Sequence, residues 1–528
     1  MRPDETSSAA STRSRSIAVI GGGTAGYMTA LAVKRRFPEM RVTVVESSTI
    51  PIIGVGEATT TLMPPFLHGE LGLDVVDLWK AVKPTLKLGI RFEWGLPDAA
   101  YSFAFPFGAA SAIDAAAHDG SLDNQSLTSL LMQERRVPLL RSPDGEIASF
   151  LGTYKFAYHL DNAPFVAFLP RASKEAGIDH VSMTIDEVAR CAGGRGVAAV
   201  RGGGREVSAD LYVDATGFRS VLLGKALGVP FVDFASSLFC DRALVATLPQ
   251  GETIEPFTTA ETMDAGWCWR IPVVGADHRG YVYSSSFLDD ESALAEMLSK
   301  NPGMREPRVV KFRSGRHAEF WCDNVVAVGN AYGFVEPLES TALHMVIVEI
   351  AYLLSGLARM NGEADIAPLR KNASDAVGAH WDYLRWFLAI HYKFNHRKET
   401  PFWQAARHDV DVSGFADLLE RYRREGAGPW MDGRHRVPGD PAFGFAGIAT
   451  LLLGQQVPSA RAPQPSVGRE EWTRRVAQNR TVVQWALGQR DALDVVSRHD
   501  ELLRELATSP SSWCAGDSER IRVPADGV

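Results

Sequence analysis

Short apolar runs that end in glycine turns are the most regular pattern in the sequence. Residues 17–20 are apolar and strand-forming, and the glycine-rich stretch 21–26 follows them directly. Residues 27–35 then have helical spacing, and residues 41–45 form a second run rich in β-branched residues. This order predicts a strand, a tight turn, a helix and a second, parallel strand.

The glycines of this turn have the spacing of a dinucleotide-binding loop. Gly21 is expected to make the turn, Gly23 to let the backbone approach a pyrophosphate, and Gly26 to pack the helix on the strand. The start of the helix would present oriented N–H groups to the phosphates. Glu46 closes the second strand about 20 residues later, where an acid can hold a ribose hydroxyl. The predicted contacts of this unit are Gly21, Gly23, Thr24, Ala25, Gly26 and Glu46.

Three later segments are also candidates for a nucleotide domain. In the loop 51–59, Gly54 and Gly56 let the backbone lie against a flat ligand, although an ordinary loop fits equally well when this segment is read alone. Residues 209–217 predict a strand that ends in an Asp-Ala-Thr-Gly turn, a common return to a flavin or nucleotide domain. Residues 324–331 predict another buried strand that ends in a glycine turn.

Two further strands carry side chains that are candidates for chemistry. Residues 86–94 alternate between apolar and other residues, with Lys87 and Arg91 on one face. Read alone, that pattern is typical of a strand with a solvent-exposed charged face. A later strand places Trp267 and Trp269 on the same side, so that the two indoles stack. Read alone, that pair is typical of two core tryptophans.

The remaining patterns predict one more strand, a loop region and an important helix. Residues 179–188 are strand-like, whereas residues 100–145 are poorly periodic and predict loops. An apolar helix is predicted from Thr341 to Leu357, with Ser340 as its cap. The start of such a helix can hold an anion through its exposed N–H groups and the positive end of its dipole.

The length and the C-terminal pattern predict the domain organisation. A chain of 528 residues is too long for one hydrophobic core, so we expect two or three subdomains. We expect a disordered leader over 1–16, a core over 17–365 with an inserted substrate-side sheet and loops at about 96–320, and a helical C-terminal subdomain over 366–528. The predicted C-terminal helices cover 376–390, 415–424, 472–487 and 492–506.

Composition excludes several classes of function. The net charge of −8 argues against nucleic acid as the main partner. No apolar run approaches the length of a membrane span, and the leader lacks an apolar signal core, so we expect no membrane partner. The five cysteines are scattered and have no CxxC spacing, which fits a reducing cytoplasm without a disulfide framework, a zinc site or another metal.

Together these pieces resemble the flavin-dependent halogenases, in the branch typified by the tryptophan halogenases. The resemblance runs from about residue 17 to 455 and is carried by the loops 21–26 and 54–59, by Trp267-x-Trp269-x-Ile271-Pro272, and by the segment 334–341. It implies an α/β fold with an FAD-binding Rossmann-type domain of the aromatic-hydroxylase and halogenase kind, mixed sheets, and a mainly helical C-terminal substrate-binding part.

The resemblance also implies a two-component enzyme. In the family, a separate NAD(P)H-dependent reductase supplies FADH2, which reacts with O2 and a chloride or bromide ion to give hypohalous acid. Trp267 and Trp269 would separate the flavin from the aromatic substrate and exclude water. Together with Ile271 and Pro272 they would line the tunnel through which the oxidant travels.

Two residues would carry the halogen transfer itself. Lys87 aligns with the catalytic lysine of the family, which holds the oxidant by a hydrogen bond or as a haloamine, and whose compact ammonium donor can polarise the halogen. Glu339 aligns with the carboxylate paired with that lysine, which orients the oxidant and stabilises or deprotonates the ring cation. Thr341 and Ala342 match the pair whose backbone N–H groups hold the halide, and with Ser340 they form the predicted halide site. The family usually has glycine where this chain has Ala342, so a methyl group would crowd the halide.

The resemblance implies further cofactor contacts beyond the first glycine loop. Asn330 stands where many flavoproteins have aspartate, and a neutral amide can still contact the flavin. The further predicted contacts are Gly54, Gly56, Glu57, Ala58, Val188, Asp214, Gly217, Asn330 and Leu343.

The substrate is the point at which this sequence departs from its family. The tryptophan halogenases hold free tryptophan through an aromatic-rich stretch with an acid, and the counterpart at 443–454 has neither an acid nor a tryptophan. We therefore expect an indole-type or phenol-type aromatic without a zwitterion, or a larger or tethered substrate, bound by a monomer or homodimer. The alternatives are a flavin monooxygenase that hydroxylates an aromatic ring and a flavoprotein with a structural or sensory role.

Overall fold

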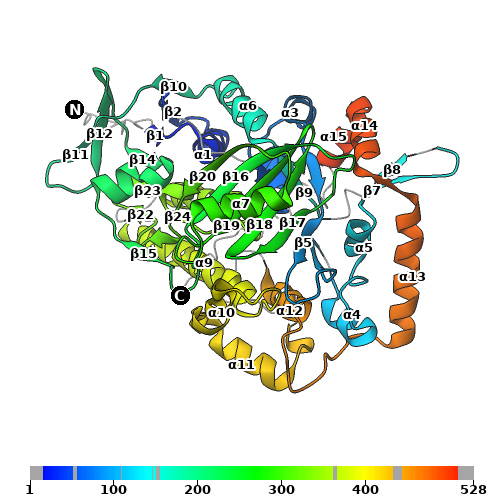
Figure 1. The fold of residues 1–528 in the computed structure, drawn as a ribbon. Helices are drawn as coiled ribbons and strands as arrows, with labels where there is room; N and C mark the ends of the chain where they lie inside the picture. The colour runs from blue at the N-terminus through cyan, green and yellow to red at the C-terminus, as the bar shows by residue number, and fades with distance from the viewer. Residues whose placement is uncertain are drawn as a thin grey trace, which may run out of the picture.

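Two large sheets organise the fold, and small sheets and helices connect them (Figure 1). This computed structural model describes residues 16–50, 56–108, 110–145, 147–149, 155–360, 366–431 and 443–508. The first large sheet is six-stranded, in the order β10-β2-β1-β14-β23-β22. Its strands are β1 (Ser16–Ile20), β2 (Arg41–Glu46), β10 (Asp179–Ser182), β14 (Leu211–Asp214), β22 (Trp321–Cys322) and β23 (Val325–Ala327).

The first sheet confirms the predicted strand-turn-helix-strand unit. β1 pairs in parallel with β2 on one side and with β14 on the other. The last four residues of β1 are buried, as expected for a parallel strand covered on both faces. Helix α1 (Thr24–Arg36) connects β1 to β2. Ser16, which is expected in the leader, is instead the first residue of β1.

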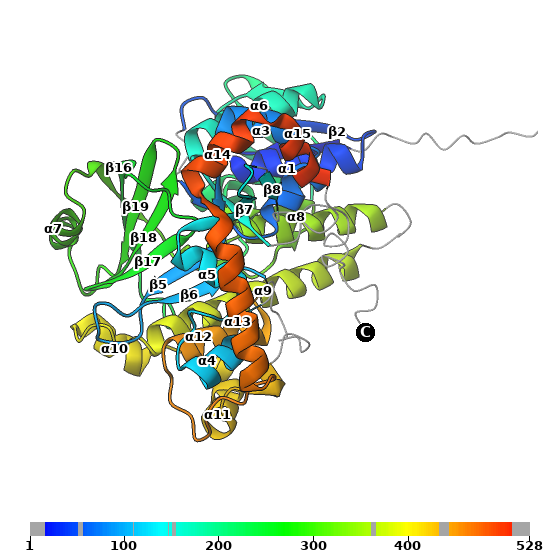
Figure 2. The same cartoon turned by 90° about the vertical axis from the view of Figure 1, so that its right-hand side faces the viewer.

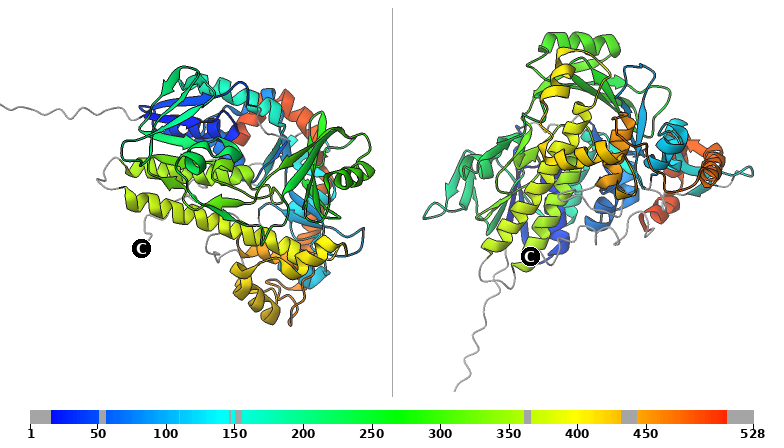
Figure 3. Two further views of the ribbon diagram at one scale, coloured as in Figure 1. Left: turned by 60° about the vertical axis from the view of Figure 1, so that its left-hand side comes forward. Right: turned by 90° about the horizontal axis from the view of Figure 1, so that it is seen from below.

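Helices cover the first sheet. α1 contacts α6 (Asn162–Glu175) and α8 (Ala342–Arg359), and α8 contacts the long helix α9 (Ala367–Lys393). α8 and α9 run side by side along one side of the molecule (Figure 3). Among the described helices, α8 alone is long and apolar enough to cross a membrane, with a mean hydropathy of 1.5, which differs from the expectation that no run approaches that length. It is 67% buried, as in the core helix of a globular domain.

The second large sheet is seven-stranded and mostly antiparallel, in the order β20-β16-β19-β18-β17-β5-β6. Helix α7 (Asp290–Lys300) packs on β16 and β19 and lies on the outer side of this sheet (Figure 2). The strands are β5 (Gly89–Glu93), β6 (Phe103–Pro106), β16 (Arg242–Pro249), β17 (Thr258–Met263), β18 (Gly266–Val273), β19 (Ala276–Tyr283) and β20 (Arg305–Lys311).

Four three-stranded sheets complete the β structure. The sheet that matters most for the site has the order β3-β9-β4, because β4 carries Lys87. Its strands are β3 (Glu57–Ala58), β4 (Thr85–Lys87) and β9 (Ala157–Leu160). The others are β11 (Glu187–Arg190) with β12 (Val197–Gly202) and β13 (Arg205–Val207); β15 (Phe231–Asp233) with β21 (Gly315–His317) and β24 (Gly333–Phe334); and β25 (Ala486–Gly488) with β7 (Arg136–Arg141) and β8 (Ile147–Ser149).

Two predicted strands are each divided between two sheets. Residues 86–94 form β4 and β5, which separate at Leu88, because its N–H donates to Pro256 and its carbonyl accepts from Phe107. A Cβ at Gly89 would lie 2.4 Å from the Phe105 carbonyl oxygen, so the close approach of β6 requires glycine there. Residues 179–188 likewise divide between β10 and β11.

The stretch 100–145 is more regular than its sequence predicts. It contains β6, β7, α4 (Ala112–Asp119) and α5 (Leu127–Gln133), and a capping box at Ser126 and Ser129 starts α5. Helix α13 (Arg469–Trp485) contacts α4, α5 and β7, and in Figure 2 it runs down the lower half of the molecule in front of α4 and α5. The helices α4 and α5 are short, and their stabilisation comes from this distant segment, so local periodicity could not reveal them.

The C-terminal part is helical as predicted, with the strand β25 as an addition. The predicted helix over 492–506 divides at His499 into two helices. The C-terminal helices besides α9 and α13 are α10 (Pro401–Asp409), α11 (Ala416–Glu425), α12 (Gly444–Gly454), α14 (Gln489–Arg498) and α15 (Asp500–Thr508). The predicted α/β class with mixed sheets and a mainly helical C-terminal part is confirmed.

Candidate active site

Lys87, the last residue of β4, is completely buried. Its Nζ donates to the Thr59 carbonyl oxygen at 2.9 Å and to Oγ of Ser340 at 2.7 Å. The ring of Phe107 lies 5.2 Å from Nζ, so an aromatic surface also borders the ammonium group. The interpretation of this strand face as solvent-exposed is therefore wrong for Lys87.

The burial of Lys87 changes its protonation. Desolvation lowers the pKa of its amine from 10.5 to about 7, and the charge of Glu339 opposes this shift. Near neutral pH, the side chain of Lys87 is therefore present both as an ammonium group, which can donate hydrogen bonds, and as a neutral amine. A buried amine with this property is suited to holding a small polar reactant in the absence of water.

The segment from Glu336 to Ser340 forms the opposite side of the site. Ser340, which accepts the hydrogen bond from Lys87, has φ of +59°, a left-handed conformation that is strained for a residue other than glycine. Glu339 is buried, and its Oε1 lies 2.8 Å from Nε2 of His391. In the described part of the chain no hydrogen bond or ion pair joins Glu339 to Lys87 directly; the two meet through Ser340.

The two tryptophans of β18 lie on the same side of the strand, as predicted. Their ring centroids are 6.0 Å apart and the rings are inclined by 56°, so the indoles are in contact but tilted, and the prediction that they stack is wrong. The indole of Trp269 occupies space next to Gly280, where a Cβ would lie 1.9 Å from the ring. The strand is tied to β4, because Oγ1 of Thr85 donates to the Pro272 carbonyl oxygen at 2.8 Å. Ile271 and Pro272 therefore lie close to the strand that carries the lysine.

Glu336 connects the tryptophans to the lysine segment, and no sequence pattern assigned it a role. Its Oε2 accepts a 2.8 Å hydrogen bond from Nε1 of Trp267 and a short one from the hydroxyl of Tyr392. Burial raises the pKa of this carboxyl to about 7, and the hydrogen bonds from Tyr392 and Trp267 oppose that shift. Trp267 and Lys87 are thus both attached to one five-residue segment, Trp267 at Glu336 and Lys87 at Ser340.

The first glycine loop has the geometry that the sequence predicts. Gly21 has φ of +124°, and a Cβ there would lie 2.2 Å from the Ala215 carbonyl oxygen. A Cβ at Gly26 would lie 2.0 Å from the Gly21 carbonyl oxygen, so both glycines are required by close packing. By contrast, nothing lies within 4 Å of a Cβ at Gly23. Gly23 is the N-cap of α1, and no side chain caps the helix. The N–H groups at the start of α1 thus have no side-chain cap, and the space beside Gly23 is open, as a phosphate site requires.

Glu46 lies beside this loop at the end of β2. Its Oε2 accepts a hydrogen bond of 2.8 Å from the hydroxyl of Tyr27, and a Cβ at Gly22 would lie 2.2 Å from the same oxygen. The carboxylate therefore lies against the glycine turn, as a ribose-binding acid requires.

The other predicted cofactor contacts have different surroundings. The carboxylate of Asp214 is buried and accepts hydrogen bonds from the N–H groups of Thr216, Leu222 and Leu223, so it fixes the turn that follows β14. Gly217 follows in that turn with φ of +62° and open space at its Cβ position.

Two short segments hold the remaining predicted contacts on the flavin side. Gly56 has φ of +83°, and its Cβ position is filled by the ring of His278. Glu57 and Ala58 form β3, and burial raises the pKa of the Glu57 carboxyl to about 7. Asn330 is exposed, in the turn after β23. Gly54 lies outside the described residues.

Among the predicted cofactor contacts, Val188 has the surroundings that least resemble a cofactor site. It pairs with Val200 in the small sheet β11-β12-β13, within the span that divides into two strands. No described feature there brings it to the glycine loop, and its role stays a prediction.

The start of α8 has an unsatisfied side chain. Thr341 rather than Ser340 is the N-cap residue, and no side chain caps the helix, so the prediction that Ser340 caps it is wrong. Instead, the Ser340 hydroxyl binds Lys87. Oγ1 of Thr341 is buried and has no hydrogen-bond partner among the described residues. Ala342 and Leu343 follow in the first turn, where N–H groups and a buried hydroxyl together fit a small anion.

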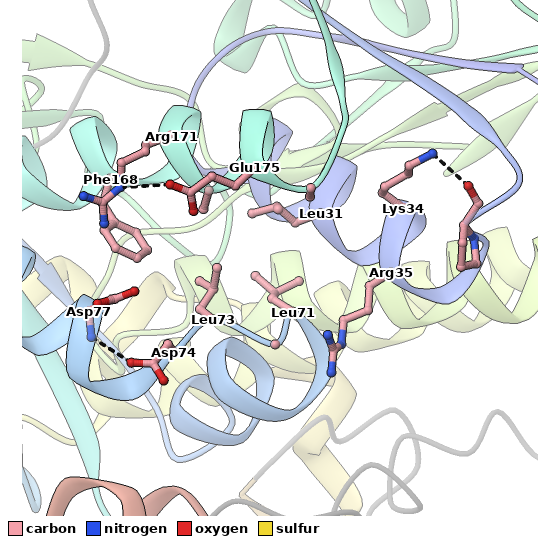
Figure 4. A pocket seen from close by; sticks show the side chains of 14 residues that line it. Leu31, Lys34, Arg35, Leu71, Leu73, Asp74, Asp77, Phe168, Arg171 and Glu175 are labelled. Atoms are coloured by element: carbon pink, nitrogen blue, oxygen red, sulfur yellow. Dashed lines mark hydrogen bonds and ion pairs between the residues drawn. The ribbon is translucent and has the colours of Figure 1, made fainter. Parts of the chain in front are cut away.

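A separate pocket lies away from these residues. It has a volume of about 400 Å³ and lies between α1, α3 (Val75–Val82) and α6 (Figure 4). Three of its charged groups have partners: Arg171 lies 3.8 Å from Glu175, and Lys34 donates to the Pro38 carbonyl oxygen. All of its lining residues are described, and they include none of the predicted site residues.

Comparison with known proteins gives consistent results. Residues 16–467 match the family model for tryptophan halogenase. The crystal structure of MibH, a lanthipeptide tryptophan 5-halogenase, is 43% identical to this chain and has a TM-score of 0.89; the alignment covers 96% of this chain and 98% of MibH.

Two further relatives support the same assignment. The tryptophan 6-halogenase SttH of Streptomyces toxytricini is 32% identical over 499 residues, which cover 87% of this chain and 93% of SttH. Tar14, a tryptophan C-6 flavin-dependent halogenase from taromycin biosynthesis, is 27% identical with a TM-score of 0.81, and the alignment covers 92% of this chain and 100% of Tar14.

Proposed function

Because the chain belongs to the tryptophan halogenase family of flavin-dependent enzymes, we propose that it halogenates the indole ring of a tryptophan carried in a peptide. The observation that carries the proposal is the buried Lys87, hydrogen-bonded to the segment that also holds Trp267 and Glu339. A buried amine, a carboxylate and an indole wall in one assembly fit electrophilic halogen transfer better than binding alone.

The glycine loop supports FAD as the cofactor. Gly21 and Gly26 allow the tight turn, and the open space at Gly23 next to the uncapped start of α1 fits a pyrophosphate. Glu46 lies where it can accept a ribose hydroxyl. Bound as FADH2, supplied by a separate NAD(P)H-dependent reductase, the cofactor would react with O2 and a halide ion to supply hypohalous acid.

The start of α8 supports a halide site. The N–H groups of its first turn have no side-chain cap, and the buried Oγ1 of Thr341 has no partner in the described part of the chain. A chloride or bromide ion would satisfy both. The methyl group of Ala342 would narrow this site.

Lys87 would hold the oxidant for transfer. Its ammonium form donates to two oxygens, so a third N–H remains for the oxygen of hypohalous acid. Donation to that oxygen draws electrons from the halogen and makes it more electrophilic toward the ring. Trp267 and Trp269 would keep bulk water and the organic substrate away from the flavin.

Two observations support a peptide substrate: the absence of an acidic residue from 443–454 and the similarity to MibH. Helix α12 and its preceding residue, at 443–454, contain no acid to bind a free α-ammonium group. The ring of Phe443 instead stacks on Phe387, with centroids 4.2 Å apart. MibH, which is 43% identical, is a lanthipeptide tryptophan 5-halogenase. A tryptophan inside a peptide has no α-ammonium group, so it needs no such acid.

The test supplies reduced FAD, O2 and bromide together with three probes: free tryptophan, N-acetyltryptophan amide and a short tryptophan-containing peptide. The proposal predicts a product with the mass of a bromide substitution from the two blocked probes and little from free tryptophan. A hydroxylated product that forms without bromide would instead support an aromatic monooxygenase. Product from free tryptophan alone would overturn the peptide assignment.

A further inference from the structure

Both ring nitrogens of His391 face an oxygen atom. Nδ1 lies 2.9 Å from the Phe387 carbonyl oxygen, and Nε2 lies 2.8 Å from Oε1 of Glu339. The ring is completely buried in helix α9. In the opposite ring orientation, carbon atoms would face both oxygens and both hydrogen bonds would be lost, so the observed orientation is the one that satisfies the ring.

These two contacts fix the number of protons in the pair. A carbonyl oxygen carries no proton, so Nδ1 must donate its own proton to Phe387. Nε2 and the carboxyl of Glu339 then need a second proton between them, because two lone pairs at 2.8 Å would repel each other. A neutral imidazole beside an ionised carboxylate has one proton too few. The His391–Glu339 pair therefore holds one proton between Nε2 and Oε1, so that the net charge of the pair is zero.

In the part of the chain that the structure describes, no charged side chain other than Glu339 makes a hydrogen bond or ion pair with His391. Its ring lies 5.3 Å from Phe92 and 5.4 Å from Phe387, and Trp94 lies edge-on at 6.5 Å, measured between ring centroids. Among the described residues, Glu339 is the only acidic group that contacts the imidazole. The hydrogen bonds of Lys87 go to Thr59 and Ser340 instead of the imidazole. The proton therefore belongs to this pair.

We propose that His391 is a positioning residue for the halogen transfer. It holds a proton against Oε1 of Glu339, which fixes the carboxylate and leaves its second oxygen, Oε2, to accept the proton that leaves the halogenated ring. This inference rests on the proposed function and deepens it by giving Glu339 one defined task. The arrangement resembles a carboxylate and imidazole that orient each other in general acid–base sites.

The step balances without another reactant. The ring carbon forms a bond to the halogen as the halogen–oxygen bond of hypohalous acid breaks, and the released hydroxide takes a proton from Lys87 to become water. The ring carbon then loses its hydrogen as a proton to Oε2 of Glu339 and recovers its aromatic electron pair. Transfer of that proton to Lys87, directly or through water, restores both groups. The sum is one aromatic C–H and one hypohalous acid converted to one carbon–halogen bond and water.

The experiment compares the wild-type protein with His391→Gln and with His380→Gln as the matched control. The amide introduced by His391→Gln would keep a neutral donor toward Glu339 but could not hold the second proton. His380 lies on the same helix and contacts Tyr352 instead of the site. Each protein receives FADH2, O2 and bromide with N-acetyltryptophan amide, either protiated or deuterated on the indole ring. Escaping hypobromous acid is measured by the bromination of phenol red.

The inference predicts that His391→Gln brominates the indole about 100-fold more slowly than wild type, while FAD affinity and hypobromous acid formation are retained. The rate should then become sensitive to ring deuteration, because proton loss becomes limiting, whereas wild type and His380→Gln should show no such effect. A merely structural role would slow the reaction without creating an isotope effect, and that result would overturn the inference.

A second measurement covers the case in which His391→Gln fails to fold. Wild-type protein labelled with 15N-histidine should show one buried imidazole protonated on both nitrogens, and Glu339→Gln should lose that signal. Its absence from wild type would overturn the inference. If wild type forms hypobromous acid but brominates none of the tryptophan probes, the proposed function itself fails, and the inference fails with it.

Discussion

Nζ of Lys87 donates a hydrogen bond of 2.7 Å to Oγ of Ser340, and the two residues are 253 positions apart in the chain. Ser340 accepts this bond from a left-handed backbone conformation at the start of α8. Strain of this kind persists where the surroundings hold a residue for a purpose. Here it turns the Ser340 hydroxyl toward the lysine and leaves the N–H groups of α8 uncapped.

The pKa of Lys87 predicts how activity depends on pH. The ammonium form is the donor to the oxidant, and burial lowers the pKa of the amine to about 7. The fraction of bound oxidant that reaches the indole should therefore fall as the pH rises through this value. The measurement is the ratio of brominated indole to hypobromous acid formed, at a series of pH values. A ratio that stays constant up to the ordinary lysine pKa of 10.5 would contradict the prediction.

Glu336 should contribute to stability in a pH-dependent way. Glu336→Ala leaves the buried donors of Trp267 and Tyr392 without an acceptor, so the free energy of unfolding should fall by about 3 kcal/mol. Glu336→Gln keeps one oxygen and should lose less. The folded state binds a proton on Glu336 up to a pKa of about 7, against 4.5 for the ordinary carboxyl, so this part of the stability is lost as the pH rises between these values. Urea unfolding should show a shallower slope in Glu336→Gln than in wild type; part of the slope remains, because burial also raises the pKa of Glu57 to about 7.

Substitutions at Gly21 and Gly23 should distinguish an effect on folding from an effect on FAD binding. Gly21→Ala should lower the free energy of unfolding by at least about 2 kcal/mol, because its Cβ meets the Ala215 carbonyl at a left-handed φ. Gly23→Ala has open space for its Cβ and should leave unfolding unchanged, yet weaken FAD binding at least about tenfold through the lost approach to the pyrophosphate. Equal FAD affinity in Gly23→Ala and wild type would count against the cofactor site.

The methyl group of Ala342 should limit the size of the halide ion that the start of α8 can bind. Its methyl group lies in the first turn of α8, beside Oγ1 of Thr341, which has no partner among the described residues. Ala342→Gly would widen the space, and the larger bromide should gain more than chloride. Competition between the two ions, read as the ratio of brominated to chlorinated product, should shift toward bromide in Ala342→Gly. An unchanged ratio would show that this methyl group does not face the halide.

The local sequence pattern was sufficient to predict the elements whose contacts are made between residues close in the sequence. The turn at Gly21, the helix that follows it and the paired indoles of Trp267 and Trp269 all depend on spacings of a few residues. Backbone geometry sets such features almost alone. The same is true of α8, whose apolar run predicts a buried helix.

Long-range contacts explain what the sequence did not reveal. The strand face of Lys87 reads as solvent-exposed, because its burial depends on Thr59 and Ser340, both distant in the chain. β4 is further held by Gln489, which donates to the Leu86 carbonyl oxygen and accepts from its N–H. The pairing of Glu339 with His391 likewise requires the C-terminal end of α9 to lie beside the start of α8. The spacing of residues along the chain gives His391 no partner.

The central claim is that the oxidant forms in one place and is used at Lys87 in another. Lys87→Met keeps most of the buried volume and removes the amine, so the most direct test measures hypobromous acid and brominated indole in parallel for this variant and wild type, with FADH2, O2, bromide and N-acetyltryptophan amide. The account predicts that Lys87→Met still forms hypobromous acid and binds FAD but loses indole bromination by about 1,000-fold. Brominated indole at the wild-type rate from Lys87→Met would contradict it.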